Sequence, residues 1–340
     1  MSGSSQSRPG LLAETIGTLA LGYAATVNAG NSQATSSSAN ACLAGGRPAL
    51  QVLGSSGPLN AEGRASTSYL LWLAGRPAIL VDVGPGSTVN LARTGANPTD
   101  LDAILLSHLH PDHVSDLPGL LWDEEVLERN RPMLIVGPAG NRYFPDTKVF
   151  LQRLFGGAGA FPEMQAILQP FSAFHLEVRV SNIAPLQPSR VATIDGIEIS
   201  AYPVPHGRAP SLAYRLEGAG FSAVLGSDQS GIDSGFANFA RDADVLVLHA
   251  ALGPQATDHP FAKVIGLPQT LGKLAAGAGV KRVVLSHLMA FPGSNASAGN
   301  FSLANPAAVL DAVRSTYGGD VSMASDLECI TFGSVKGIDR

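Results

Sequence analysis

Three histidines and one aspartate are gathered into a single short turn of the chain, in the segment SHLHPDH. They are His108, His110, Asp112 and His113, and an apolar run that begins at Ala103 leads directly into them. Imidazole nitrogens and carboxylate oxygens are the groups with which proteins hold zinc and related ions. Without a cation, the rings and the carboxylate would crowd together with nothing to compensate their burial and charge. The cluster therefore predicts a metal site.

The ligands of this cluster are expected to point in two directions. His108 and His110 lie two residues apart in an extended segment, so their rings point the same way. Asp112 and His113 come after Pro111, where the chain turns toward the next helix. Two ligand pairs with different directions are sufficient for two adjacent metal ions.

Three more candidate ligands each stand at the end of an apolar segment. His206 ends EISAYPVPH, Asp228 ends SAVLGSD and His287 ends RVVLSH. A strand-end histidine taken alone, such as His206, is more often an ordinary surface or capping residue. The repetition is informative, because α/β folds bring strand ends together at one sheet edge to build their sites. We therefore expect these three residues to join the first cluster.

The segments that must position these residues alternate between strands and helices. Strands are expected at residues 49–57, 67–75, 78–84, 102–108, 132–138, 174–181, 191–206, 211–228, 243–250, 281–287 and 326–332. Helices are expected at residues 87–96, 115–130, 268–280 and 304–318, and residues 141–175 are expected to be helical in pieces. Ser115 is the expected N-cap of the second helix. Two strand-rich halves with helices in one compact domain predict a layered α/β sandwich.

The overall composition limits the classes of protein that fit. The chain has 340 residues, of which 45 % are hydrophobic and 14 % charged, so it is not disordered over most of its length. Its formal net charge is −5, with 22 Lys and Arg and no basic run. Binding a polyanionic backbone requires clustered cations, so bulk nucleic-acid binding is not expected. Beyond the N-terminal segment no apolar run reaches about 18 residues, so no membrane span is expected.

The first 45 residues differ from the rest of the chain. The mildly apolar segment LLAETIGTLALGYAATVNAG follows Arg8 and precedes a tract rich in Ser, Ala and Asn. This order is similar to an export signal with a cleavage site near Ala29, although Glu14 interrupts the apolar part. Residues 1–45 are therefore expected to be a leader with a flexible tract, in a periplasmic or secreted protein. The alternative is a disordered leader on a cytoplasmic protein.

The two cysteines bear on the same question. Cys42 follows the apolar part of the leader, and Cys329 lies near the end of the chain. In an oxidising compartment two lone cysteines are expected to form a disulfide, whereas in the cytoplasm they would be two buried thiols. Export and pairing are thus linked predictions.

The order of the motifs resembles that of the metallo-β-lactamase superfamily. The matching motifs are VDVG, SHLHPDH, PVPHG with LAYRLE, LGSDQ and VVLSHL, and they extend over about residues 50–332. The opening, LGSSGP followed by Arg64 and then SYL, is most similar to the branch that contains ribonuclease Z, phosphodiesterases and arylsulfatases. The resemblance implies a four-layer αββα sandwich in a single domain, which would occupy residues 46–340.

The resemblance also implies which residues hold the metals. Its pattern assigns the first metal to His108, His110 and His206, the second to Asp112, His113 and His287, and the bridging position to Asp228. A water or hydroxide would bridge the ions as well. Two divalent cations are expected, with zinc first and manganese or iron compatible with the same donors.

Further site residues follow from the same resemblance. Asp82 of VDVG would support the ligand loop from behind, or would simply be a buried strand-end carboxylate. Asp112 and His249 are expected to be catalytic, His249 by assisting proton transfer; a core histidine with satisfied hydrogen bonds is the alternative. The phenylalanines of residues 141–175 form either an apolar wall near the metals or part of the core. Candidates for the substrate pocket are Arg64, Met289 and Phe291.

The departures from the resemblance bear on the substrate. The tRNA-processing members carry a glutamate where this chain has Ala250, and of the Lys, Asn and Arg of their opening loop only Arg64 is present. No basic arm that could clamp tRNA is visible, which disfavours tRNA 3′ processing. Asp228 argues against a true β-lactamase, because those enzymes generally lack the bridging aspartate.

The resulting prediction is a dinuclear metal-dependent hydrolase that uses a metal-bridging hydroxide on a small ester, namely a phosphodiester or an aryl phosphate or sulfate ester. Its partner would be that small-molecule substrate rather than nucleic acid, and a homodimer stays open. The alternatives are a lactonase or β-lactamase-like hydrolase, a tRNA 3′-processing endonuclease, an iron-dependent oxidoreductase, and an inactive binding module on the same fold.

Overall fold

The computed structural model describes residue 42, residues 46–59, 61–289 and 305–332, and the backbone of residues 297–298 and 301–302. Apart from Cys42, the predicted leader of residues 1–45 lies outside the described residues, so the export signal stays a prediction. Within the described ranges, no helix combines the length and the apolar character that crossing a membrane requires.

Two seven-stranded mixed sheets form the centre of the domain, and the first has the order β16-β1-β2-β3-β4-β5-β6. Its strands are β1 (Ala49–Gly54), β2 (Ser68–Leu73), β3 (Arg76–Val81), β4 (Ala103–Leu105), β5 (Met133–Pro138), β6 (Leu176–Ser181) and β16 (Cys329–Thr331). Strands β1 to β3 pair antiparallel, whereas β3 to β6 run parallel. The apolar runs of β1 and β2 are buried along their whole length, as expected for strands covered on both faces.

The second sheet has the order β15-β12-β11-β10-β9-β8-β7. Its strands are β7 (Ser189–Ile194), β8 (Ile197–His206), β9 (Ala209–Gly218), β10 (Phe221–Leu225), β11 (Val245–His249), β12 (Arg282–Ser286) and β15 (Asp320–Met323). Strands β7 to β10 form an antiparallel meander, whose first turn is Asp195 and Gly196 with φ of 48° and 77°. Two positive φ values are what a tight two-residue hairpin requires. A separate short pair consists of β13 (Ser297–Ala298) and β14 (Phe301–Ser302).

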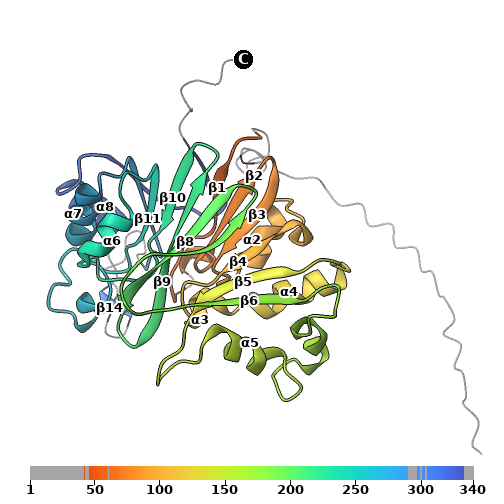
Figure 1. Cartoon of the computed structure of the whole chain (residues 1–340). Helices are drawn as coiled ribbons and strands as arrows, with labels where there is room; N and C mark the ends of the chain where they lie inside the picture. Colours follow the sequence, from red (N-terminus) through yellow and green to blue (C-terminus); the bar gives the residue numbers. More distant parts are fainter. Residues whose placement is uncertain are drawn as a thin grey trace, which may run out of the picture. The chain divides into compact units, whose positions relative to one another are not determined.

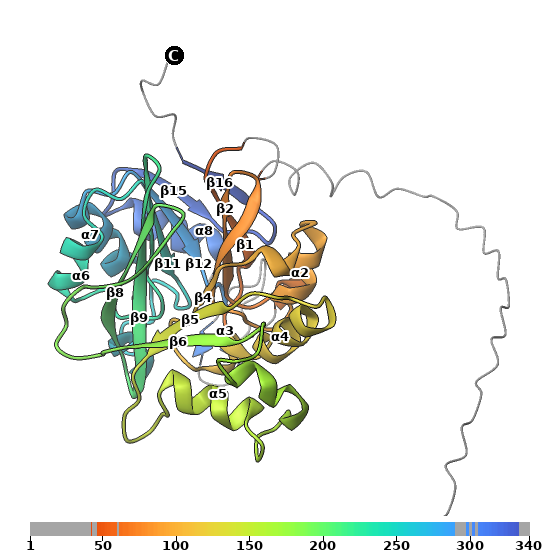
Figure 2. The same ribbon diagram turned by 45° about the vertical axis from the view of Figure 1, so that its right-hand side comes forward.

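Helices cover the outer face of each sheet, so the domain has four layers (Figure 1, Figure 2). The helices over the first sheet are α2 (Ser87–Arg93), α4 (Leu117–Val126) and α5 (Thr147–Phe155), and those over the second are α6 (Ser234–Phe239), α7 (Pro268–Ala278) and α8 (Pro306–Arg314). The core between the sheets combines residues such as Leu71 and Ile79 of the first with Ile199 and Leu216 of the second. The predicted αββα sandwich in a single domain is confirmed.

The loop that carries the first histidine cluster contains the one-turn helix α3 (Pro111–Val114). The prediction of Ser115 as an N-cap is wrong, because Ser115 ends α3 and Asp116 stands at the N-cap of α4. Asp116 forms no side-chain bond with its own helix; its Oδ2 accepts hydrogen bonds from the backbone N of Gly86 (2.8 Å) and of Thr88 (3.2 Å). The carboxylate therefore caps α2 and ties the ligand loop to it.

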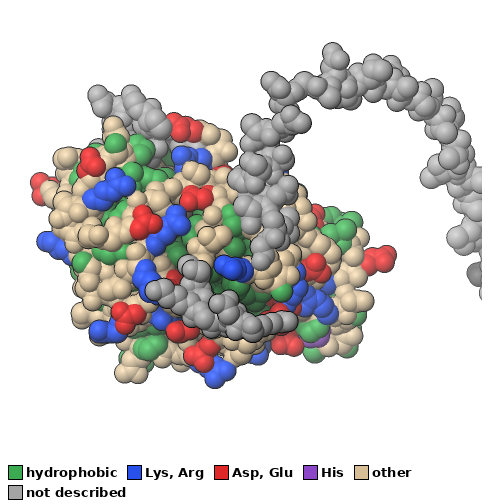
Figure 3. Space-filling view, turned by 90° about the horizontal axis from the view of Figure 1, so that it is seen from above, with side chains coloured by type: hydrophobic (Ala, Val, Ile, Leu, Met, Phe, Trp, Pro, Cys, Tyr) green, Lys and Arg blue, Asp and Glu red, His purple; other side chains and the backbone are tan. Residues whose placement is uncertain are grey.

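Charged side chains of both signs share the surface that Figure 3 shows. On this face the lysines and arginines alternate with aspartates and glutamates rather than forming one basic track. Such a surface offers phosphate groups isolated cations and no continuous positive field.

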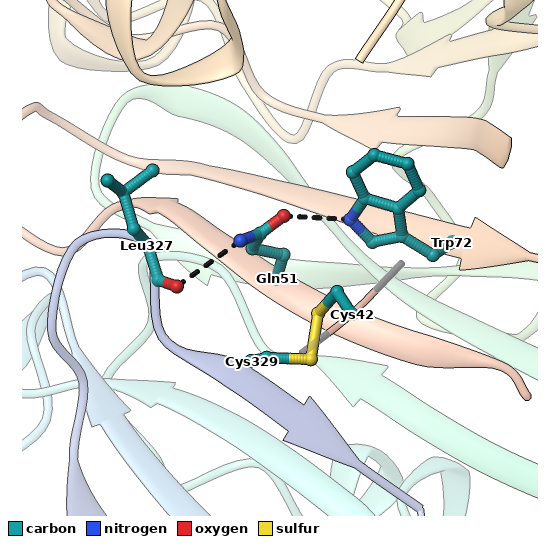
Figure 4. The surroundings of a disulfide bond; sticks show 5 residues. All are labelled: Cys42, Gln51, Trp72, Leu327 and Cys329. Carbon is teal, nitrogen blue, oxygen red and sulfur yellow. Dashed lines mark hydrogen bonds between the residues drawn. A yellow bond between two sulfur atoms is a disulfide. The ribbon is translucent and has the colours of Figure 1, made fainter. Parts of the chain in front are cut away.

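A disulfide joins Cys42 to Cys329 in the closing strand β16, with 5.6 Å between the two Cα atoms (Figure 4). Beside it, Gln51 of β1 links two neighbours: its Nε2 donates to the carbonyl oxygen of Leu327 (3.2 Å), and its Oε1 accepts from Trp72 Nε1 (2.8 Å). The predicted pairing of the cysteines is confirmed, and it ties the segment before β1 to the last strand.

Candidate metal centre

All seven predicted ligands converge at one edge of the sandwich, where strands of both sheets end. Strand β8 ends at His206, Asp228 lies three residues beyond β10, and His287 directly follows β12. The cluster from His108 to His113 occupies the loop and helix α3 that follow β4. The strand-end pattern of the sequence therefore predicted correctly which residues meet.

The first ligand group consists of His108, His110 and His206. His110 Nδ1 lies 3.0 Å from His108 Nε2 and 3.4 Å from His206 Nε2. His108 and His206 are buried and His110 is half-buried. Three ring nitrogens gathered this closely, each within 4.8 Å of the others, can serve a single ion.

The second ligand group consists of Asp112, His113 and His287. Asp112 Oδ2 lies 3.1 Å from His287 Nε2 and 3.5 Å from His113 Nε2. Both histidines are buried, and Asp112 is half-buried at the start of α3. This group adds a carboxylate oxygen to two ring nitrogens, so it carries the negative charge that the first group lacks.

Asp228 stands between the two groups and turns one oxygen toward each. Its Oδ2 lies 3.5 Å from His206 Nε2 and 4.0 Å from His108 Nε2. Its Oδ1 lies 3.4 Å from His287 Nε2 and 3.9 Å from His113 Nε2. This is the arrangement that a bridging carboxylate requires.

Asp82, which follows β3, holds the ligand loop from behind. Its Oδ1 accepts a hydrogen bond from the Ser107 backbone N, and its Oδ2 accepts one from the Ser107 hydroxyl, both at 2.7 Å. The same Oδ2 lies 2.8 Å from His113 Nδ1, which leaves His113 Nε2 to face the second group. A carboxylate that fixes the orientation of a ligating imidazole in this way is common at metal sites.

Two glycines are required because the backbone approaches the ligands closely. A Cβ on Gly84, the glycine of VDVG, would lie 2.2 Å from the carbonyl oxygen of Asp112. A Cβ on Gly57 would lie 2.5 Å from two ring atoms of His287. Any side chain at either position would displace a ligand, which explains the glycines in physical terms.

Backbone strain is concentrated at the same edge. Asp82, Ser227 and His287 have φ of 60°, 56° and 57°, a region that residues other than glycine rarely adopt. Each of the three is a ligand, a direct neighbour of a ligand, or the support of one. Strain that the surrounding fold imposes at such positions is typical of functional sites.

The electrostatics of the cluster keep Asp112 ionised and draw positive charge to the second ligand group. Burial raises the pKa of Asp112, but the hydrogen bond with His287 and the charge of His113 outweigh it and lower the pKa to about 2. Burial lowers the pKa of His108 well below its usual range. Burial also lowers the pKa of His113, yet Asp82 raises it to about 9, so this group attracts positive charge. A divalent ion binds ionised carboxylates and neutral imidazoles, so an ion bound by His113 would replace the proton that Asp82 stabilises on that ring.

A buried nitrogen without a partner supports the same conclusion. Among the described residues, His113 Nε2 has no hydrogen-bond partner although it is buried and its ring is fixed by Asp82. The atoms that it faces are carboxylate oxygens of Asp112 and Asp228. A buried ring nitrogen that lies among carboxylate oxygens without a hydrogen bond is suited to a cation, either a proton or a metal ion. The residues present therefore fit a divalent metal.

His249 ends β11, and one of its ring nitrogens lies within 4.8 Å of ligand atoms of His113, Asp228 and His287. Its Nδ1 lies 2.6 Å from Asp228 Oδ1, and its Nε2 lies 3.2 Å from the hydroxyl of Tyr69 in β2. Both side chains are buried, and burial lowers the pKa of His249 to about 4. The neutral ring can thus donate to Asp228 while it accepts from Tyr69. Sequence reasoning did not identify Tyr69, for which the only signal was its place in the SYL motif.

A cavity of about 530 Å³ lies over the cluster. Its floor contains His110, Asp112, His206, Asp228 and His287, and its walls are formed by Pro58, Pro111, Phe144, Gly207, Arg208, Ala209, Phe261, Val264, Ile265 and Met289. His249 is not among the described residues that line it. A mostly apolar cavity over a polar floor suits a ligand with an apolar body and one reactive polar group.

The predictions for the pocket are met in part. Met289 lines the cavity, whereas Phe291 lies outside the described residues. Arg64 is not among the described residues that line the cavity. Its Nη1 donates to the Ser55 hydroxyl (3.1 Å), which follows β1 of the first sheet, and to the carbonyl oxygen of Ala324 (3.0 Å), which follows β15 of the second.

The phenylalanines of residues 141–175 belong partly to the core and partly to the cavity wall, the two alternatives that the sequence left open. The segment is helical in pieces as predicted, with α5 and the 3₁₀ helix η3 (Pro162–Leu168). Phe155 is buried between the first sheet and its helices, whereas Phe144 lines the cavity with its ring centroid 5.6 Å from that of His110.

The fold and the ligand cluster define a metal-dependent hydrolase. Residues 61–211 match the family model described as the metallo-beta-lactamase superfamily. Ribonuclease Z of Mycolicibacterium paratuberculosis is 30 % identical over 252 residues, which cover 70 % of this chain and 85 % of the relative. Ribonuclease Z of Mycobacterium marinum is 28 % identical over 251 residues, which likewise cover 70 % of this chain and 85 % of the relative. The chain belongs to the metallo-β-lactamase superfamily.

Solved structures share the fold at lower sequence identity. Human short-form tRNase Z has a TM-score of 0.62 at 19 % identity, over 84 % of this chain and 100 % of that one. A diphosphatase of the PhnP family has a TM-score of 0.58 at 17 % identity, over 84 % of this chain and 98 % of that one. At such identities the likeness concerns the fold alone.

Proposed function

We propose that this protein is a dinuclear hydrolase whose substrate is a small phosphodiester or an aryl phosphate or sulfate ester. The observation that carries the proposal is the position of Asp228, whose two oxygens face the two ligand groups separately. A carboxylate so placed can bind two ions at once, and a two-ion site suits in-line displacement at phosphorus or sulfur.

In this proposal each ligand group holds one ion and Asp228 is shared. The first ion would be held by His108, His110 and His206, and the second by Asp112, His113 and His287. Zinc is the expected ion because nitrogen-rich donors with carboxylate oxygens suit it, and manganese or iron fits the same donors. When bound, two such cations make water acidic enough to attack at neutral pH and polarise the ester that is cleaved.

The residues of the chain position the reactants. Asp112 lines the cavity and its low pKa keeps it ionised, so it can orient the attacking water by accepting a hydrogen bond. His249 contacts Asp228 from the side away from the cavity, so we assign it to holding that carboxylate rather than to protonating the leaving group. Phe144 and Met289 give the cavity an apolar wall, which suits an aryl group and limits the access of water.

A second candidate function is cleavage of RNA. The observation that favours it is the similarity to proteins named ribonuclease Z over 85 % of their length. The formal net charge of −5 and the lack of a basic run in the sequence favour the small ester instead, because a polynucleotide is bound mainly through clustered cations. Ala250, in place of the glutamate of the tRNA-processing members, points the same way.

A substrate panel distinguishes the two candidates. The metal-reconstituted protein is assayed with bis(4-nitrophenyl) phosphate, 4-nitrophenyl sulfate, a phosphotriester, a lactone and a precursor tRNA with a 3′ extension. Each assay is repeated with Asp228→Asn, so that activity from a contaminating phosphodiesterase is recognised. We expect hydrolysis of a small ester that depends little on salt. Efficient cleavage of the precursor tRNA with a steep salt dependence, and no turnover of small esters, would contradict the proposal.

We also propose that the protein is exported. The disulfide between Cys42 and Cys329 supports this, because disulfides persist in oxidising compartments. The full chain is expressed in a bacterium, and its location, N-terminal residue and free thiols are determined. Periplasmic protein that has lost most of its first 45 residues and lacks free thiols is the expected result. Full-length cytoplasmic protein with two free thiols would contradict export.

A further inference from the structure

The rim of the cavity carries one cationic side chain beside the candidate metal centre. Arg208 lies in the turn between β8 and β9, two residues after His206. Among the described residues that line the cavity, it is the single lysine or arginine. The walls nearby are apolar, and Phe144 packs its ring against that of the predicted ligand His110. A charged group of the ligand that lies away from the metals would therefore meet Arg208.

A second arginine contacts the same tyrosine ring as the first. The guanidinium carbons of Arg208 and Arg142 lie 4.9 Å and 4.6 Å from the ring centroid of Tyr143. Such contacts stabilise a cation over an aromatic ring modestly at an exposed position. Tyr143 is 48 % exposed, so both guanidinium groups remain open to solvent at the rim.

The two segments that carry these arginines are fastened to each other. Asn141 Nδ2 donates to the carbonyl oxygen of Arg208 (2.9 Å), and Asn141 Oδ1 accepts from the backbone N of Tyr143 (2.8 Å). The loop after β5 and the turn after β8 are thus joined at one point. This bond holds the arginine pair in place, so binding an anion costs less ordering of the loop.

The charges of the pair are not compensated within the described part of the chain. Neither Arg142 nor Arg208 forms an ion pair there with an acidic side chain, unlike Arg190, which lies 3.5 Å from Glu198. Both cations lie near one ring, so an anion bound by one guanidinium is also attracted by the charge of the other. A planar guanidinium also binds carboxylate and phosphate oxygens in pairs.

We propose that Arg208 and Arg142 form an anion subsite that selects esters whose non-leaving arm carries a carboxylate or phosphate group. The proposal rests on the function proposed above: the ester lies over the metal ligands, the apolar body lies against Phe144, and the anionic end meets the arginines. The subsite accepts one anionic group at a fixed place rather than a long phosphate backbone.

A matched pair of substrates tests the subsite. The esters are 4-nitrophenyl 4-carboxyphenyl phosphate and 4-nitrophenyl 4-carbamoylphenyl phosphate, which share a leaving group and differ in the charge of the other arm. For the wild-type enzyme we expect a KM about three- to fivefold lower for the carboxylate, in keeping with an exposed ion pair. We expect equal kcat values, because this contact is made equally in the ground and transition states.

The variants locate the effect. In Arg208→Gln the KM difference between the two esters is expected to vanish, because the KM of the carboxylate ester rises to that of the carbamoyl ester, and Arg142→Gln should reduce the difference in part. The control Arg153→Gln removes an exposed arginine of α5 and should keep the full difference. Equal KM values in the wild-type enzyme, or an unchanged difference in Arg208→Gln, would overturn the subsite.

Two other outcomes separate this inference from the proposed function. If neither ester is hydrolysed by the metal-loaded wild type, the proposed function itself fails and the subsite fails with it. If Arg208→Gln impairs cleavage of precursor tRNA and leaves the difference between the esters intact, the pair serves a polynucleotide, and the subsite as proposed is wrong.

Discussion

The two ligand groups are built from different side chains, although a single carboxylate lies between them. The first group has three imidazoles, of which His110 is half-buried and faces the cavity. Its outer contacts are weak: His108 Nδ1 lies 3.1 Å from the Ser107 hydroxyl, and His206 Nδ1 lies 3.2 Å from the carbonyl oxygen of Val264. One ligand of this group, His110, is accessible, and the two buried rings are held loosely.

The second group contains an anionic ligand and is supported more firmly. Asp112 belongs to it, and His113 is fixed by Asp82, which is itself 1 % exposed. The ring of His287 has no room to move toward Gly57. Charged ligands on a rigid support favour tight binding of a cation, whereas an open group of neutral ligands favours exchange with substrate. We therefore expect the second group to bind its ion first.

The largest effect is expected when the shared carboxylate is removed. Asp228→Asn leaves one oxygen to bind and takes away the charge between the groups, so hydrolysis should fall by on the order of a thousandfold. The measurement is kcat/KM together with the metal content of the variant. Asp123→Asn, on the exposed side of α4, is the matched control and should retain activity. A variant at Asp228 with near wild-type activity would remove the basis of the two-ion account.

The difference between the groups predicts two distinct binding steps. Asp112→Asn should weaken the binding of the metal ion in the tighter step by at least about a hundredfold, because a charged ligand is lost. His110→Gln should abolish the weaker step and leave the tighter one. Competition with a chelator of known affinity measures both. If His110→Gln removed the tighter step instead, the order assigned to the two groups would be reversed.

A smaller effect is expected when Asp82, which supports the second group, is replaced. Asp82→Asn keeps one side-chain oxygen that can accept hydrogen bonds, but it removes the charge that orients the ring of His113. The affinity for the metal ion bound in the tighter step should therefore fall by about ten- to a hundredfold. The weaker step serves as the internal control and should change little. Equal weakening of both steps would show that Asp82 stabilises the whole ligand loop rather than one group.

The smallest effect on the site is expected when the disulfide, which lies outside both ligand groups, is removed. Replacing Cys42 and Cys329 by serine opens a covalent link across 287 residues and should lower the free energy of unfolding by roughly 2–4 kcal/mol. Metal stoichiometry and kcat of the folded variant should match the wild type. Loss of a metal ion at temperatures where the variant stays folded would contradict this separation of stability from the site.

The strand-end ligands could be predicted from the sequence because each one ends an apolar run, and this signal is local. The sandwich followed from the order of the same motifs. The contact of Tyr69 with His249 could not be predicted, since the two residues lie 180 positions apart in strands of different sheets. Their distance depends on how the two sheets pack.

Two errors have the same physical origin. Arg64 was expected at the pocket, but it bonds to the carbonyl oxygen of Ala324, which lies 260 positions away in the sequence. Ser115 was expected to cap a helix, but the capping group in this loop is Asp116, which caps α2 rather than its own helix. A side chain that serves a distant partner gives no local pattern by which it could be recognised.

The central claim is that one carboxylate joins two metal-binding groups in this chain. Elemental analysis of the full chain, stripped of metal with a chelator, reconstituted with zinc and freed of loosely bound ions, tests it most directly. We expect close to two zinc ions per chain for the wild type, bound in two steps, and fewer for Asp228→Asn. One ion or none in folded wild-type protein after full reconstitution would contradict it.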